Sequence, residues 1–429
     1  MTLKFRLNDV VRTVLFVLVS LVVLGGTNDT ILAANQVYVI FAFLIFLAGR
    51  KIKERSLSLK VLKGYKNAFL LCLLASIWML IGLLYSLDTV FSLRLCAYFG
   101  IYIFIIFFPL KGAEYDSLFH CMKVCSIILA ISIILSAIFG YSFVNLFSFW
   151  FKNYDRLIKD IYYGQYSGLI GDRAFASMAM CTAMYLQISE VLSKHKTNLN
   201  DVILIGIFFV ALMLTGKRIS LLMIVCGVFV CLFVSGDKKA KRTIAKFTMV
   251  MALVGTIALV SIPQTQVLFD RIVAGLGDTT YNDRLKFWIV AYEMFLDRPI
   301  TGYGIGSFLI YNLRYGTGIK QYAHNMYFQF AAELGIVGTA LIVTLFAYFL
   351  HKSIKQISTS NSYVLSSEIK YSYSKRYNYF SVLTQVGFLV YGLTGYPFYN
   401  LQQGVLYAIC VSFSLYYDSM NIKEYMKNI

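Results

Sequence analysis

Charged residues are scarce in this chain of 429 residues. Only 14% are charged and 59% are hydrophobic, and the mean hydropathy is +0.69. A soluble domain of this size could not cover itself with so little polar surface. Apolar runs of about 17–22 residues recur, long enough for helices to cross a hydrocarbon core, and they are continuous rather than alternating, which disfavours a β-barrel. The sequence therefore predicts an all-α integral membrane protein.

The sequence also lacks metal-ligand spacing. Its eight cysteines lie in or at the ends of apolar runs, and none is spaced with histidine as a metal site requires. We interpret them as buried thiols and predict no disulfide, metal or cofactor. The net charge of +18 would suggest nucleic acid for a soluble protein, but here we attribute it to basic loops that fix membrane orientation. No nucleic-acid partner is expected.

About twelve membrane spans are predicted, among them a two-helix hairpin over 202–235, which is too long for one crossing. The predicted spans are 10–26, 33–49, 67–86, 95–110, 119–140, 174–192, 202–216, 219–235, 247–262, 334–351, 379–396 and 401–417. With the N-terminus inside, the inside segments hold 24 of the 39 Lys and Arg residues and the outside segments hold 13. The positive-inside rule then predicts that both ends face the cytoplasm. The first span is interpreted as an uncleaved signal anchor, because no small-x-small site closes it.

Internal repeats, low-complexity tracts and soluble domains are also missing, so residues 1–429 are predicted to form a single polytopic membrane domain. Only two outside loops exceed about 15 residues, the length above which structureless connections are usually functional. These are a smaller extracytoplasmic loop, 141–173, and a large, partly helical one, 263–333. We expect function to lie there.

The large loop contains YNDRLKFWIVAYEMFLDRPITGYGIGSF and, further on, AHNMYFQFAAELGIVG. The first part predicts an amphipathic helix that begins near Asn282 or Asp283 and ends before Pro299. Its apolar stripe comprises Leu285, Trp288, Ile289, Tyr292 and Leu296, and its polar face comprises Lys286, Glu293 and Asp297. Such a helix would lie along the outer membrane surface or pack over the mouth of the bundle.

Arg284 stands in the first turn of this predicted helix, one turn before Trp288. An arginine beside free N-terminal amides is a good anion site, since guanidinium binds phosphate oxygens bidentately. The alternative is an exposed arginine paired with Asp283 or a lipid headgroup. Aromatic rings such as Trp288 and Tyr303 suit sugar faces and lipid interfaces equally, so they do not choose between these ligands.

The glycines of TGYGIGS do not form a dinucleotide-binding fingerprint, because no βαβ unit surrounds them. They predict a tight, close-packed turn. Further on, Asn325 is a predicted N-cap that places His324 at the outer interface, the only histidine expected outside. An imidazole there suits proton transfer, or serves simply as a hydrogen-bonding group. Glu333 would orient a basic partner at the start of the tenth span.

Two more basic groups are predicted outside. Lys217 and Arg218 form the turn of the 202–235 hairpin, where they either mark an exposed tip or supply a second phosphate ligand. Asp172 and Arg173 open the sixth span after the smaller loop and are weaker candidates for the same role.

Along residues 281–340, the helix with Arg284 and Trp288 is followed by RPITGYGIGSF and then by AHNMYFQFAAELGIVG. In this order the three elements resemble the signature of the bacterial O-antigen polymerase and ligase superfamily. The resemblance implies a glycosyltransferase C-like bundle. It also implies a metal-independent, inverting glycosyltransferase that takes its donor glycan from undecaprenyl diphosphate at the outer face of the cytoplasmic membrane. Carried over by motif, Arg218 and Arg284 would hold the diphosphate, and His324 would act on the acceptor hydroxyl. Lys217, Arg173, Trp288, Tyr303, Asn325 and Glu333 are expected to line the substrate site.

Two cations in a low-dielectric mouth would stabilise the leaving diphosphate, and a base would accept the hydroxyl proton. We favour a polymerase of oligosaccharide repeat units for O-antigen, capsule or exopolysaccharide. Its partners would be lipid-linked donor and acceptor, membrane lipids and a chain-length regulator. The alternatives are a ligase that transfers polymer to the lipid A core and, in another class, a lipid-linked oligosaccharide flippase. A transporter would usually show repeats and ionisable residues at mid-membrane, which are not evident here.

Overall fold

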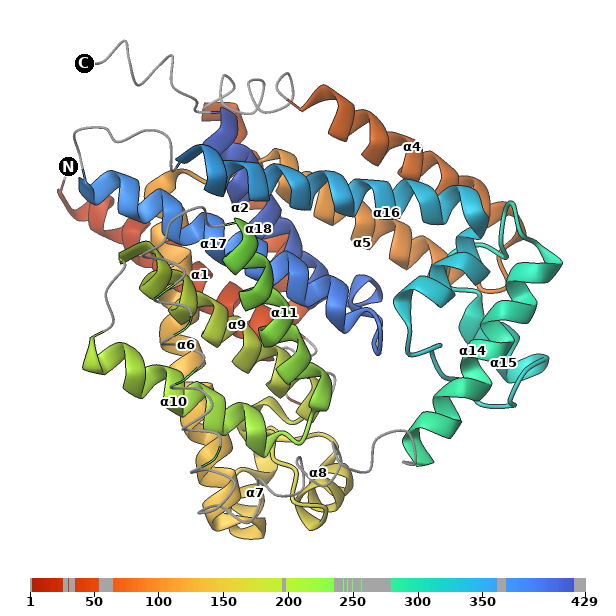
Figure 1. Ribbon diagram of the computed structural model, residues 1–429, viewed down its shortest axis with the longest axis horizontal. Coiled ribbons are helices and arrows are strands. Elements are labelled where there is room, and N and C mark those ends of the chain that lie inside the picture. The colour runs from red at the N-terminus through yellow and green to blue at the C-terminus, as the bar shows by residue number, and fades with distance from the viewer. Residues whose placement is uncertain are drawn as a thin grey trace. The chain divides into compact units, whose positions relative to one another are not determined.

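A computed structural model describes residues 2–25, 30, 35–53, 65–194, 198–234, 279–360 and 368–419, with isolated positions 242, 245, 249 and 256 between (Figure 1). Within these residues every regular element is a helix, and β structure is confined to one isolated bridge between Thr30 and Phe151. The chain divides into two units. Unit 1 comprises Met1–Gly49, Leu110–Val273 and Ile357–Gly387, and unit 2 comprises Arg50–Pro109, Ala274–Gln356 and Phe388–Ile429.

Unit 1 is built around helix α9 (Arg173–Lys194), which is buried along most of its length. The other elements of unit 1 are α1 (Thr2–Gly25), most of α2 (Gln36–Lys53), α6 (Gly112–Phe139), α7 (Tyr141–Leu146), η3 (Ser148–Trp150), α8 (Tyr154–Tyr162), η4 (Gly168–Ile170), α10 (Leu199–Leu214), α11 (Arg218–Val234) and the larger part of α17 (Glu368–Tyr391). Helices α1, α6, α10 and α11 all contact α9. Small buried residues such as Ala176, Ala179 and Ala183 allow this close approach.

One ion cluster ties three helices of unit 1 together. Glu190 on α9 accepts a 2.8 Å bond from Lys123 of α6 and lies 3.3 Å from Arg376 of α17. Lys194, one turn later on α9, pairs with the other oxygen of Glu190 at 2.6 Å. A largely buried carboxylate is therefore matched by several cations, the condition under which such a charge is tolerated.

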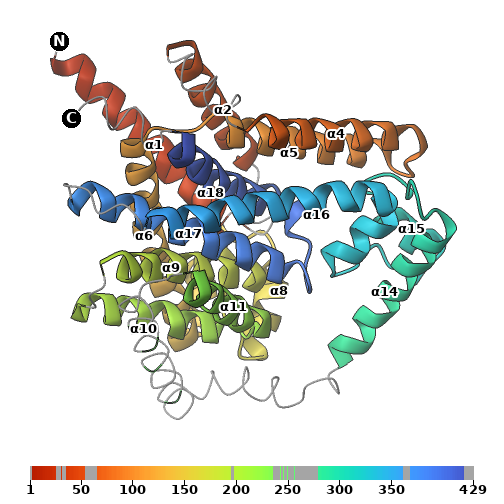
Figure 2. The same cartoon turned by 45° about the horizontal axis from the view of Figure 1, so that its top comes forward.

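Unit 2 contains the remaining helices. They are α4 (Lys66–Gly82), η2 (Leu83–Tyr85), α5 (Thr89–Phe107), α14 (Thr279–Asp297), α15 (Phe308–Arg314), α16 (Met326–Ser360, most of it), the end of α17, η6 (Pro397–Tyr399) and α18 (Leu401–Ser419). Helices α4, α5 and α16 run along similar directions in both views, and α5 packs on α18 (Figures 1 and 2). Asp88 caps α5 by accepting the Phe91 N–H at 3.0 Å.

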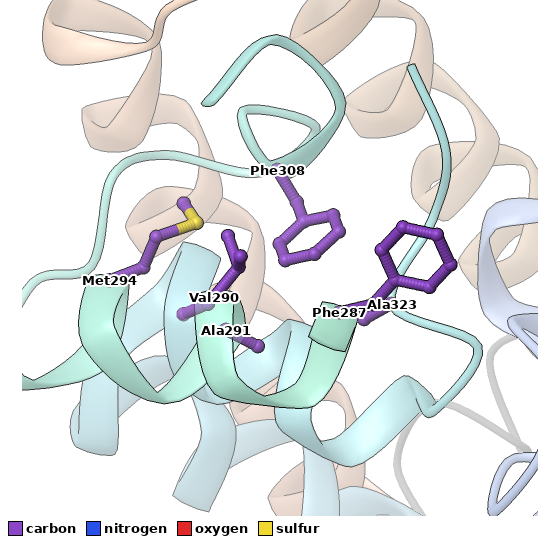
Figure 3. Close-up of a cluster of buried hydrophobic side chains, with 7 residues drawn as sticks. Phe287, Val290, Ala291, Met294, Phe308 and Ala323 are labelled. Carbon is purple, nitrogen blue, oxygen red and sulfur yellow. The ribbon is translucent and has the colours of Figure 1, made fainter. Parts of the chain in front are cut away.

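Helix α14 runs across the direction of α4 and α16 rather than alongside them (Figures 1 and 2). Its buried face carries Phe287, Val290, Ala291 and Met294, which meet Phe308 of α15 in one apolar cluster (Figure 3). The face that packs on the protein is not the predicted stripe, which the sequence analysis placed either along the outer membrane surface or over the mouth of the bundle. Leu285, Ile289, Tyr292 and Leu296 of that stripe are 41–61% exposed, and only Trp288 is partly buried. Both faces are apolar, so periodicity alone could not show which one packs.

Eleven of the twelve predicted spans coincide with helices, and the ninth, 247–262, lies mostly outside the described residues. In the described part of the chain, five helices are long and apolar enough to cross a membrane. They are Lys66–Tyr85, Thr89–Phe107, Gly112–Phe139, Arg173–Lys194 and Met326–Ile357. All eight cysteines are free, and all but Cys96 and Cys226 are buried. The number of crossings, their orientation and the single-domain organisation stay predictions.

Candidate active site

The predicted glycine turn exists and folds against a break in α16. Gly302, Gly304 and Gly306 all have positive φ, between +66° and +85°. At Gly335, φ is +63° and ψ is −170°, so α16 is interrupted there, where the tenth span was predicted to begin. Backbone bonds join the two segments: the Gly304 N–H donates to the Glu333 carbonyl at 2.8 Å, and the Ile336 N–H donates to the Pro299 carbonyl, also at 2.8 Å.

These glycines are needed because backbone meets backbone. A Cβ on Gly302 would lie 2.4 Å from the Glu333 carbonyl group, and one on Gly335 would lie 2.2 Å from the Ile300 oxygen. On the other side of the turn, a Cβ on Gly304 would lie 2.5 Å from the Gly82 carbonyl oxygen at the end of α4. The turn is therefore clamped between α4 and α16, as the glycine spacing predicted for a structural role.

The carboxylate of Glu333 closes this clamp. It is fully buried, and each oxygen accepts two hydrogen bonds. Oε2 accepts from the Gly306 N–H and the Tyr399 hydroxyl, both at 2.7 Å. Oε1 accepts from the Phe308 N–H at 3.0 Å and from Gln329 Nε2 at 3.1 Å. Because protein donors already satisfy both oxygens, we interpret Glu333 as a positioning residue, and its predicted contact with substrate stays a prediction.

His324 lies directly beyond this network. The Ala323 N–H donates to Gln329 Oε1 at 3.3 Å, which connects the residue before the histidine to Glu333. His324 itself has φ +52° and is the only non-glycine residue with positive φ in the described ranges. Such backbone strain persists only where the surroundings enforce it, and it is common at functional sites.

Asn325 is the N-cap of α16, as predicted. Its Oδ1 accepts the Tyr327 and Phe328 N–H groups at 3.0 and 3.1 Å, and the residue is buried. This bonding assigns Asn325 to fixing the helix start, and through it the direction of His324. Its predicted contact with substrate stays a prediction.

The imidazole of His324 is partly exposed and has polar and aromatic neighbours. Its Nε2 lies 2.8 Å from Gln321 Nε2. The His324 ring centroid is 5.7 Å from that of Tyr396 and 6.1 Å from that of Phe287. Tyr396, from the link between α17 and α18, also stacks on Tyr322 at 4.0 Å.

The Phe287 contact brings His324 to the helix that carries Arg284. Arg284 lies three residues before Phe287 on α14, and side chains three apart on a helix are neighbours. However, α14 begins at Thr279, so Arg284 lies in the second turn and not in the first. The sequence argument that Arg284 stands among free N-terminal amides is therefore wrong. What the structure shows is that its helix contacts His324 through Phe287.

Trp288 and Tyr303 join the elements of this region. The Trp288 ring meets Phe328 of α16 edge-on, with centroids 5.6 Å apart. The Tyr303 hydroxyl donates to Asp297, and its ring lies under the guanidinium of Arg298 at 4.3 Å. Burial and the bond to Asp297 raise the pKa of Tyr303 to about 12, so the phenol stays protonated at neutral pH. That these residues contact substrate stays a prediction.

Unit 1 gathers a second polar group, in the smaller predicted loop. Asp172 caps α9, because its Oδ1 accepts the Ala174 and Phe175 N–H groups at 2.6 and 3.1 Å. Its other oxygen accepts from Arg156 of α8. Arg173 Nε lies 3.6 Å from Oδ1 of Asp160, also on α8. The 141–173 segment is thus largely helical, with its own apolar cluster of Phe143, Val144, Phe151 and Leu157.

This group reaches the hairpin that carries Lys217 and Arg218. The Tyr166 N–H donates to the Leu214 carbonyl at 2.9 Å, and a Cβ on Gly216 would lie 2.9 Å from the Gln165 side chain. Burial raises the pKa of the Asp160 carboxyl, and the charges of Arg173, Arg156 and Lys217 act in the opposite direction. The structure therefore pairs Arg173 with Asp160 and packs the smaller loop on the hairpin, so the Lys217–Arg218 turn is not an isolated tip.

Several residues at these two sites were missed by the sequence analysis. The Oδ2 atom of Asp160 is buried and accepts no hydrogen bond from the described residues. In unit 2, burial raises the pKa of Tyr322, with smaller contributions from Tyr396 and Glu333, and Arg94 lowers it. No local motif marks these residues, because their partners lie far away in the chain.

Chemically, unit 2 offers the imidazole of His324 in contact with the helix that carries Arg284, and unit 1 offers two arginines paired with two aspartates. The imidazole in unit 2 can accept or donate a proton. The arginines of unit 1 can bind an anion bidentately through guanidinium groups.

The helices that are long and apolar enough to span define a multi-pass membrane protein. A family model described as O-antigen ligase matches residues 203–343, which include Arg218, Arg284, the glycine turn and His324. This match confirms the resemblance to the O-antigen polymerase and ligase superfamily, and it does not favour the polymerase over the ligase. No curated protein matches the chain.

A first prediction concerns the Glu333 network. Glu333→Ala would leave the Gly306 and Phe308 N–H groups buried without acceptors, each costing roughly 1–3 kcal/mol. We expect a clearly lower thermal unfolding midpoint for the purified protein in detergent, measured by intrinsic fluorescence. Glu293→Ala, which removes an exposed carboxylate from α14, is the control and should melt like the wild type. Equal midpoints for both variants would contradict the positioning role.

A second prediction separates backbone strain from crowding in the turn. Gly302 and Gly318 both have positive φ, +66° and +77°, so alanine costs roughly 1–2 kcal/mol of strain at either position. At Gly302 the added Cβ would also meet backbone at 2.4 Å, whereas at Gly318 no described atom lies within 4 Å. Gly302→Ala should therefore lower the unfolding midpoint much further than Gly318→Ala. Similar losses would show that the clamp tolerates a side chain.

Proposed function

We propose that this protein polymerises undecaprenyl-diphosphate-linked oligosaccharide repeat units at the outer face of the cytoplasmic membrane. The products would be O-antigen, capsule or exopolysaccharide, made by metal-independent, inverting glycosyl transfer. The observation that carries the proposal is the fixed position of His324. His324 has a strained backbone, lies next to Phe287 on the Arg284 helix, and falls within the segment that the family model matches.

In this mechanism the acceptor hydroxyl oxygen attacks the anomeric carbon of the donor from the face opposite the diphosphate. The new carbon–oxygen bond forms as the bond from the anomeric carbon to the phosphate oxygen breaks, and the diphosphate leaves with the electron pair. His324 accepts the hydroxyl proton, a contribution worth about 10²–10⁴-fold. Arg284 and Arg218 stabilise the charge that develops on the leaving group.

The unit 1 group supports a diphosphate ligand in this scheme. Arg173 and Lys217 share the Asp160 centre, and Arg218 follows Lys217 directly in the hairpin. Because Asp160 and Asp172 already offset part of their charge, the cations are held in place before the ligand arrives. The unpartnered Oδ2 of Asp160 would accept a hydrogen bond from a sugar hydroxyl.

The alternative within the superfamily is a ligase that transfers finished polymer to the lipid A core. It shares the donor chemistry and differs in the acceptor. The description of the matching family model names this activity, which keeps it in view. A flippase is a weaker alternative. His324, with its strained backbone beside the helix that carries Arg284, has no evident role in transport.

A third prediction tests the site residues in a host whose own polymerase gene is deleted. Arg284→Ala should abolish the glycan ladder, since loss of one charge-stabilising donor costs about 10²–10³-fold in rate. His324→Asn is the sharper variant for the histidine, because asparagine tolerates positive φ while removing the imidazole. Arg314→Ala, an exposed arginine at the end of α15, should restore a full ladder. If Arg284→Ala and His324→Asn are expressed and also restore it, the site assignment is wrong.

A fourth prediction separates polymerase from ligase. We expect deletion of the gene from its own host to leave surface glycan with a single repeat unit, detected on a gel stained for polysaccharide. A ligase deletion would instead leave full-length polymer on the carrier lipid, recovered in the organic extract. Accumulation of that lipid-linked polymer would refute polymerisation while leaving the site chemistry intact.

A further inference from the structure

Helix α14 has an apolar stripe that the protein does not cover. Leu285, Ile289, Tyr292 and Leu296 follow one another at helical spacing and are 41%, 50%, 61% and 57% exposed. Ile300, just after the helix, continues the line and is 62% exposed. We call these five residues the outer stripe. The opposite face of α14 is already used, because Phe287, Val290, Ala291 and Met294 pack in the cluster of Figure 3.

The outer stripe ends beside an exposed apolar surface. Thr301, the residue after Ile300, accepts a hydrogen bond from the Tyr85 hydroxyl at 3.3 Å, and Tyr85 ends the apolar segment Lys66–Tyr85. That segment exposes a run of large apolar side chains, the last of which is Leu84 at 86%. Its exposed residues are Phe69, Leu70, Leu73, Leu74, Ile77, Leu80, Ile81 and Leu84. The apolar surface of a candidate span therefore continues directly into the outer stripe.

The direction of α14 fits the edge of a bilayer. It runs across α4 and α16, two helices long and apolar enough to span, in both views (Figures 1 and 2). A helix that crosses spanning helices at their ends lies near the plane of the membrane surface. Charged residues flank the outer stripe without interrupting it: Lys286, Glu293 and Asp297 are exposed on one side. This is the pattern of an interfacial helix, with an apolar face and a charged border.

We propose that the outer stripe of α14 is embedded in the bilayer interface, in the leaflet that surrounds the Tyr85 end of the segment Lys66–Tyr85. The partner of the stripe is then the bilayer itself. Five side chains in a single row fall well short of the roughly 800 Å² per partner that a stable protein interface buries. They suffice for a helix that is already tethered to a membrane-spanning bundle. The stripe would fix the height of Arg284 and His324 relative to lipid headgroups. The proposal concerns lipid contact alone and stands apart from the proposed enzymatic function.

The test measures lipid contact directly in nanodiscs made with brominated phosphatidylcholine, since bromine quenches nearby tryptophan. Ile289→Trp places an indole on the outer stripe, and Lys286→Trp places one on the charged border of the same helix. We expect the emission added at position 289 to be quenched about twofold more than that added at 286, because interfacial helices bury their apolar face about 5–10 Å deep. Lipid brominated near the headgroup should quench more strongly than lipid brominated near the chain ends.

Tyr292→Trp, a conservative exchange on the same stripe, provides a second probe should Ile289→Trp not be expressed. Equal quenching of the stripe probes and of Lys286→Trp would overturn the proposal. The absence of quenching in both Ile289→Trp and Tyr292→Trp would overturn it as well. Protection of the stripe probes together with a dimer in size-exclusion chromatography would assign the stripe to a second copy of the chain instead. Because no substrate is present, failure of the proposed enzymatic function would leave this result unchanged.

Discussion

The site in unit 2 depends on one buried carboxylate. Glu333 binds the backbone on both sides of Ser307, accepts from Tyr399 before α18, and connects through Gln329 to the residue before His324. A buried charge is expensive unless donors surround it, so these four bonds hold only if all the segments take their native positions together. The glycine turn, the break at Gly335 and the strained histidine are consequences of that requirement. A single interaction thus couples folding of the loop to the direction of the imidazole.

In unit 1, paired charges hold basic side chains in place. Cations that bind a diphosphate would repel one another and remain mobile in an empty site, whereas Asp160 and Asp172 hold Arg173 and Arg156 from α8 and the start of α9. The smaller loop is folded around its own apolar cluster and is bonded to the Lys217–Arg218 hairpin. The arginines are consequently carried by helices, Arg156 by the short α8 and Arg173 by the first turn of α9. Preorganisation of this kind lowers the cost of binding a charged ligand.

Helix α14 shows where pattern analysis meets its limit. The sequence predicted an amphipathic helix, and its end before Pro299 was right, because proline cannot continue a helix. The predicted start was late by about one turn, since Asn282 and Asp283 resemble a cap although the helix begins at Thr279. The sequence analysis left open whether the apolar stripe lies on the membrane surface or on the bundle, and the face that packs on α15 is a different one. Both sides of α14 carry large apolar residues, and only the neighbouring α15 and the segment before His324 decide which side is covered.

The sequence by itself determined the class of protein, eleven of the helices, the glycine turn and the cap at Asn325, because hydropathy, glycine spacing and capping chemistry act over a few residues. The motif order also pointed to the superfamily that the family model then matched. The tertiary structure decided the rest. It gave Glu333 its four donors, placed Phe287 beside His324, and joined Arg173 to Asp160, pairs whose members pack together without any local signal. Contacts of that kind depend on how helices pack, and packing is set by the whole core rather than by any one segment.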